Sequence, residues 1–161
     1  MKNALLVKSG KKLTPGVIEK LECALGYALP PEYRQFLFEH NGGEPAPNAP
    51  CKFWVCLDLK WQDSIERFFS VALTKKYAYL PFVWRFDLDY RPRQLLPIAW
   101  APSAGVVYLG LSHGLSGKVF FVCDAKVPSA VTPTSTDADI LVDRGMIKVA
   151  DSFQQFLEKL F

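Results

Sequence analysis

Apolar residues at helical spacing mark the start of the chain. They recur at intervals of three and four residues, which places them on one face of an α-helix: Ile18, Leu21 and Leu25. We expect Thr14 to cap the first free amides of this helix, and Pro15 suits the first helical position. Gly26 predicts the end of the helix, because glycine readily adopts the left-handed conformation found after helix C-termini.

A second apolar face follows Pro30 and Pro31, which redirect the chain. Its members again share helical spacing: Tyr33, Phe36, Leu37 and His40. The sequence Asn41-Gly42-Gly43 predicts that this helix stops with Gly42 or Gly43 at positive φ. Two packed helices therefore open the predicted fold.

The middle of the chain changes to patterns typical of strands. Residues 53–57 are β-prone, and residues 96–100 form a short apolar run. Residues 105–111 and 117–123 alternate well enough to predict an antiparallel hairpin, with residues 112–116 as its loop.

Two helices are predicted within this strand-rich region. Asp63, followed three residues later by Glu66, resembles the capping box of a short helix. That helix would carry Ile65, Phe68 and Phe69. The aromatic segment 75–89 is predicted to be mostly helical, and Pro81 must start, kink or end any helix there.

The end of the chain holds one more helix. Residues 127–139 are rich in Pro, Ser and Thr, which predicts an irregular surface segment before the apolar residues 140–142. We expect the last helix to begin at Asp151, with Gln154 completing a pair like a capping box. Its buried face would consist of Phe153, Phe156, Leu157 and Leu160. Helices, then strands, then a helix predict an α+β fold with an antiparallel sheet.

Composition adds limits on size and location. The chain has 161 residues, of which 50% are hydrophobic and 22% charged, so we expect a single globular domain over residues 1–161. The longest apolar run near the start, residues 4–7, is too short for a signal peptide or a membrane span, which favours a cytoplasmic protein. Cys23 and Cys123 have apolar neighbours and are expected to pack as small hydrophobes, and the scattered cysteines fit a reducing compartment.

The residues that could carry chemistry do not form a recognisable set. His40 is interpreted as a packed imidazole at a helix C-terminus, and His113 as a loop residue without a nucleophile pattern nearby. Cys51 and Cys56 lack the second pair that a zinc site needs. We therefore predict no catalysis, no metal and no cofactor. The mild net charge of +3 is spread along the chain without the basic stripe typical of nucleic-acid binders, so we do not expect direct nucleic-acid binding. Without an apolar run of membrane-spanning length, we also expect no membrane partner.

Three blocks of the sequence resemble the SUKH superfamily. The first and most specific block contains Leu13-Thr14-Pro15, Leu25-Gly26, Leu29-Pro30-Pro31-Glu32-Tyr33-Arg34-Gln35-Phe36-Leu37 and His40-Asn41-Gly42-Gly43. The second contains Leu96-Pro97-Ile98-Ala99, Gly105-Val106-Val107-Tyr108-Leu109 and Gly117-Lys118-Val119-Phe120-Phe121. The third is Val149-Ala150-Asp151-Ser152-Phe153-Gln154-Gln155-Phe156-Leu157.

This resemblance implies a fold and a class of function. The fold is an α+β domain with an antiparallel or mixed central sheet, flanked by N-terminal helices and a C-terminal helix. Many members are immunity proteins that bind and neutralise secreted bacterial toxins, often nucleases, without catalysis. The resemblance therefore implies a cognate toxin as partner. The alternative is a scaffold or regulatory domain with a non-toxin partner, as in the cell-wall regulators of the superfamily. The oligomeric state is left open.

The sequence departs from the family pattern in residues 51–90 and 125–144. We expect the partner-binding surface in residues 58–93, which largely overlap the first of these regions. A shared fold cannot by itself select one toxin, so selection needs a distinctive patch. Aromatic anchors and an acidic rim are available there: Asp58, Trp61, Asp63, Tyr79, Trp84, Asp87, Asp89 and Tyr90. The carboxylates would quicken association with a cationic toxin, if they form a local patch despite the positive net charge.

Overall fold

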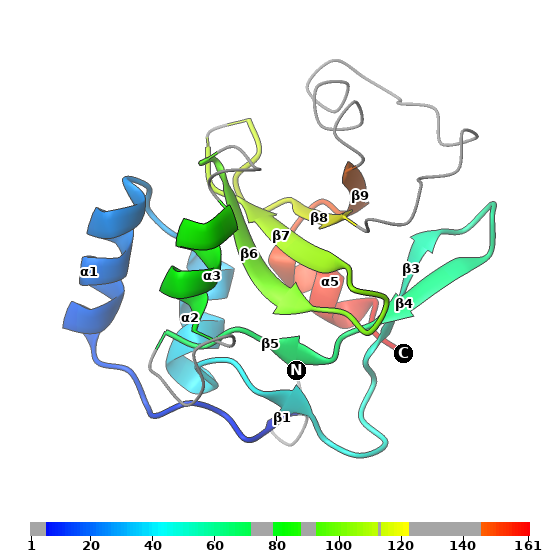
Figure 1. Ribbon diagram of the computed structural model, residues 1–161, viewed down its shortest axis with the longest axis horizontal. Coiled ribbons are helices and arrows are strands. Elements are labelled where there is room, and N and C mark those ends of the chain that lie inside the picture. The colour runs from blue at the N-terminus through cyan, green and yellow to red at the C-terminus, as the bar shows by residue number, and fades with distance from the viewer. Residues whose placement is uncertain (1–5, 72–78, 88–92, 113, 123–145) are drawn as a thin grey trace.

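An antiparallel sheet of five strands lies at the centre of the molecule (Figure 1). The computed structural model describes residues 6–71, 79–87, 93–112, 114–122 and 146–161. The strands of the sheet, in spatial order, are β5 (Arg67–Phe68), β6 (Leu95–Trp100), β7 (Val106–Gly110), β8 (Val119–Val122) and β9 (Met146–Ala150). The predicted strand at 96–100 and the predicted hairpin of residues 105–123 are thus confirmed as β6, β7 and β8 over their described residues.

Two small antiparallel sheets and four described helices complete the fold. The small sheets pair β1 (Leu6–Val7) with β2 (Glu44–Pro45), and β3 (Lys52–Cys56) with β4 (Trp61–Ser64). The helices are α1 (Pro15–Leu25), α2 (Pro31–Glu39), α3 (Leu80–Asp87) and α5 (Phe153–Glu158). The α+β class with flanking N-terminal and C-terminal helices is confirmed, and every described strand pair is antiparallel.

The central sheet is buried on both faces. Alternate residues such as Val107, Leu109 and Phe121 belong to the main core. That core joins α2, α5 and β5 through ring contacts: the Phe36 ring lies 5.2 Å from Phe153 and 5.0 Å from Phe68. The residues between them form a second buried cluster of Leu95, Tyr108, Phe120, Val122 and Met146. The middle strands therefore serve as framework.

The first helix follows the sequence prediction except at its cap. Pro15 is the first residue of α1, and Gly26 ends it with φ 74° while its N–H donates to the Glu22 carbonyl at 3.0 Å. The Thr14 side chain makes no capping hydrogen bond, so that prediction is wrong. Its carbonyl oxygen instead accepts from the Val17 N–H at 3.0 Å, which begins the helix through the backbone alone.

The turn after α2 is a buried junction between three parts of the chain. Gly42 (φ 75°) and Gly43 (φ 127°) both take positive φ, as predicted for one of them, and Asn41 (φ 47°) does so as well. The Asn41 side chain is buried: its Nδ2 donates to the Lys11 carbonyl at 2.7 Å, and its Oδ1 accepts from the Val71 N–H at 2.8 Å. This turn thus fixes α2 against the N-terminal segment and the chain after β5.

The helix predicted from Asp63 and Glu66 does not exist. These residues lie in or beside β4 and β5, and the Asp63 carboxylate accepts from the adjacent Ser64 N–H at 2.7 Å. The Glu66 N–H donates to the Trp100 carbonyl at 2.9 Å, across to β6. Pairing with distant strands outweighed a local capping signal. The helix predicted within the aromatic segment 75–89 is present as α3, which begins at Leu80, directly before Pro81.

The last helix begins later than predicted. Ser152, not Asp151, is its N-cap, and the Ser152 hydroxyl accepts from the Gln155 N–H at 3.0 Å. The Gln155 Oε1 in turn accepts from the Asp151 N–H at 2.8 Å. The capping pair is therefore shifted by one residue from the predicted Asp151 and Gln154, since serine is at least as good a cap as aspartate.

One cysteine prediction is also wrong. Cys23 is exposed because it lies on the face of α1 opposite to Ile18, Leu21 and Leu25, which are buried in the core. Cys123, the predicted irregular segment of residues 127–139 and the apolar residues 140–142 lie outside the described residues.

Candidate functional site

The β3–β4 hairpin carries Leu57, the most exposed large apolar side chain among the described residues. Phe53 and Val55 of β3 are buried in the core, which anchors the hairpin. Its turn, residues 57–60, leaves Leu57 68% and Leu59 40% exposed. Figure 1 shows this hairpin extending away from the rest of the molecule. An anchored hairpin with an apolar tip is suited to contact with another protein.

Three of the predicted partner-binding residues lie on this hairpin. Asp58 is exposed in its turn. Trp61 begins β4 but is half-buried, with its ring 6.1 Å from the Phe121 ring of the core. The Asp63 carboxylate accepts hydrogen bonds from Ser64 and from the Ser103 hydroxyl. Of these three, Asp58 is the one most available to a partner.

The other predicted residues lie elsewhere. Tyr79 is half-buried beside Ser70, and Trp84 on α3 packs against the main core. Asp87 is the last residue of α3, and Asp89 and Tyr90 lie outside the described residues. Figure 1 shows α3 and the β3–β4 hairpin on opposite sides of the molecule. The structure therefore does not bring Tyr79 and Trp84 together with Asp58, Trp61 and Asp63.

Sequence reasoning missed the exposed apolar residues themselves. Leu57 and Leu59 alternate with Asp58 and Lys60 in a turn, where polar residues are usual. That alternation within a turn was the available signal. Phe161 is 48% exposed and was assigned no role, although its ring packs 5.8 Å from the ring of Trp54 on β3.

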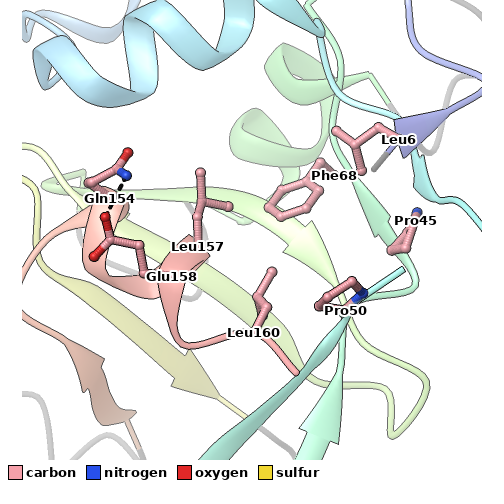
Figure 2. Close-up of a pocket in the computed structure, with 8 residues that line it drawn as sticks. All are labelled: Leu6, Pro45, Pro50, Phe68, Gln154, Leu157, Glu158 and Leu160. Atoms are coloured by element: carbon pink, nitrogen blue, oxygen red, sulfur yellow. Dashed lines mark hydrogen bonds between the residues drawn. The ribbon is translucent and has the colours of Figure 1, made fainter. Parts of the chain in front are cut away.

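A small apolar pocket lies beside the C-terminal helix (Figure 2). It is lined by Leu6, Pro45, Pro50, Phe68, Gln154, Leu157, Glu158 and Leu160. Its volume is about 140 Å³, below the roughly 300 Å³ at which ligand-binding clefts begin. One polar pair lies on its rim, where Gln154 Nε2 donates to Glu158 Oε1 at 2.7 Å. The pocket has room for one apolar side chain of a partner.

The titratable groups of the framework suggest structural roles. Burial lowers the pKa of His40, although nearby Glu39 opposes the shift, and the ring packs 5.3 Å from Phe36. Burial also raises the pKa of Tyr33, whose hydroxyl has no hydrogen-bond partner among the described residues. Within the described ranges, no group of three or more His, Cys, Asp or Glu side chains could hold a metal ion.

Comparison with known families identifies the chain. The sequence model of the SMI1 / KNR4 family (SUKH-1) matches residues 12–159, nearly the whole sequence. The chain belongs to this family. The match spans α1, α2, the buried turn at Asn41, the central sheet and α5. No curated protein matches the sequence.

SUKH-1 membership places the chain among protein-interaction domains. At the level of the family, its function is immunity or the SMI1/KNR4 type of role. Separately, none of the helices in the described part of the chain is long and apolar enough to cross a membrane.

Proposed function

We propose that this SUKH-1 protein is an immunity protein that neutralises a bacterial toxin by binding and covering it, without chemistry of its own. The observation that carries this proposal is the family match over residues 12–159. Exposed apolar residues on an anchored hairpin support it, because protein partners are bound through such patches.

The experiment is protection of cells. An immunity gene normally lies beside its toxin gene, so each protein encoded next to this chain is expressed in a host with and without it. The expected result is growth arrest by one neighbour, relief of the arrest by this chain, and a stable complex of the two on size-exclusion chromatography. A Gly42→Val variant, which should not fold stably, is the control that must fail to protect.

The second candidate is a regulatory or scaffold domain with a non-toxin partner. It is favoured by the matching family model, which is the one named for SMI1 and KNR4. A stable complex with a neighbour that arrests no growth would select this role. If growth arrest persists although this chain is present and correctly folded, immunity against that toxin is excluded.

A further inference from the structure

A groove separates two strands that lie next to each other without pairing. We call it the β3–β9 groove; its lining residues are Phe53, Trp54, Val55, Leu57, Lys148, Val149, Phe156 and Lys159. β9 is an edge strand of the large sheet, and β3 belongs to the separate hairpin sheet. Its volume of about 360 Å³ falls within the range of roughly 300–1,000 Å³ that ligand-binding clefts occupy. The β3–β9 groove can therefore hold a segment of a partner chain, whereas the smaller pocket beside α5 has room for one side chain.

The edge of β3 that faces away from β4 already accepts a strand-like partner. The Lys52 N–H donates to the Phe161 carbonyl at 3.0 Å, and the Phe161 N–H donates to the Lys52 carbonyl at 3.0 Å. Backbone groups along a strand alternate in direction, so those of Trp54 point to the same side as those of Lys52. Among the described residues none pairs with Trp54 on this side, so the next position along this edge offers an N–H and a C=O to an extended segment.

Lysine side chains give the groove its charge. Lys148 and Lys159 line it. The Lys148 Nζ lies 2.6 Å from the Asp151 carboxylate. The pKa of Asp151 is lowered first by the hydrogen bond from Lys148 and by the Lys148 charge, and then by the charges of Lys159 and Lys118. Two lysines thus line the groove, and one carboxylate pairs with Lys148, so this rim carries a net positive charge and is suited to an acidic partner.

Apolar surface lies within reach of the same rim. Leu57 is 68% exposed, and the half-buried Trp54 ring packs on Phe161, which is 48% exposed. Aromatic side chains of this kind contribute strongly to protein interfaces. A segment in the groove would therefore meet apolar contacts as well as lysines.

We propose that the β3–β9 groove binds an extended acidic segment of a partner protein, which adds as a strand to the open edge of β3 beyond Phe161. Its backbone pairs with Trp54, its carboxylates meet Lys148 and Lys159, and its apolar side chains contact Trp54 and Leu57. Main-chain pairing supplies affinity in such strand addition, and side chains supply selectivity. This inference rests on the proposed function and names the surface and the chemistry of the partner.

The test uses a synthetic probe. A short blocked peptide that alternates glutamate and valine is titrated into the isotopically labelled protein, and amide shifts are followed by NMR. Shifts should concentrate at Trp54, Leu57 and Lys148. A peptide with lysine in place of glutamate should not produce them, and neither should the acidic peptide with alternate backbone nitrogens methylated, because it cannot pair as a strand on that side.

Matched variants separate the groove from overall charge. Lys148→Glu with Lys159→Glu should weaken binding of the acidic peptide at least about tenfold. Lys12→Glu with Lys20→Glu gives the same net charge with exposed residues in or before α1, on the other side of the molecule, and should bind like the parent. Melting temperatures establish that each variant is folded, and Lys159→Gln alone serves if the first double variant is not.

Three results would overturn the proposal. The first is that the amides of Trp54 and Lys148 do not shift up to about 1 mM acidic peptide. The second is that the lysine peptide binds equally well, and the third is that the shifts centre on the pocket of Figure 2. The peptide assay needs no toxin, so its failure is distinct from failure of the protection assay. Peptide binding without protection would retain the groove and reject the immunity role.

Discussion

Two turns of this SUKH-1 protein share a backbone feature and differ in everything around it. The turn at residues 41–43 and the turn at residues 57–60 both contain positive φ. The first is buried, and its side-chain and backbone groups bond to three other segments. The second leaves two leucines exposed. The first turn therefore specifies the fold, whereas the second is free to vary with the partner.

The largest expected effect lies at Gly42. A Cβ there would lie 2.6 Å from the Phe69 carbonyl oxygen, at φ 75°. Gly42→Ala should lower the free energy of unfolding by about 2–5 kcal/mol, through left-handed strain plus overpacking. Gly26→Ala is the matched control, because Gly26 has nearly the same φ of 74° and nothing within 4 Å of its Cβ. Equal losses in urea unfolding of the two variants would mean that the close approach at Gly42 carries no cost.

Asn41 comes next. Asn41→Ala should cost about 2–4 kcal/mol, because the Lys11 carbonyl and the Val71 N–H each lose a partner in or near the core. Asn48 is an exposed asparagine, also at positive φ (66°), so Asn48→Ala should cost less than about 1 kcal/mol. Thermal and urea unfolding of the pair give the comparison. Similar losses would contradict the structural role of the buried side chain.

The buried turn should also make stability depend on pH through the adjacent His40. Burial lowers the folded pKa of His40 below its ordinary value of 6.5, so the unfolded chain binds more protons as pH falls past that value. The stabilisation is complete above pH 6.5 and is lost as pH falls through the folded pKa. Urea unfolding at several pH values should show a flatter profile for His40→Gln in this window. Asp151, whose lowered pKa lies below 3.8, affects only more acidic conditions.

The smallest effect is expected at the exposed turn. Leu57→Ser with Leu59→Ser should change the free energy of unfolding by no more than about 0.5 kcal/mol, since both side chains face solvent. Val55→Ala, in the buried part of the same hairpin, should cost about 2 kcal/mol. Should the serine variant unfold as easily as Val55→Ala, the hairpin tip would be part of the fold and not a free surface.

Sequence patterns predicted well what depends on neighbours in the chain. Gly26 and the pair Gly42 and Gly43 were identified because a helix end at positive φ is a local requirement that glycine meets. The helix predicted from Asp63 and Glu66 was wrong because their segment pairs with Cys51 and Trp100, far away in sequence. Local signals do not contain that information.

The proposed groove illustrates the same limit. It joins Trp54 on β3 with Lys148 on β9, and the strand patterns alone do not show that these edges are neighbours. Its lysines also give it the opposite charge to the acidic rim expected from Asp58 and Asp63. The predicted surface of residues 58–93 stays a prediction, and the peptide titration would locate binding on one surface or the other.

The burial of the central sheet on both faces has a consequence for evolution. Substitutions in β7 and β8 change the core, so they can seldom alter partner choice without weakening the fold. Lineages that encounter new partners would then diversify fastest at the hairpin and at the strand edges. Exchange of the β3–β4 hairpin between relatives should accordingly transfer partner preference while the recipient keeps its own core.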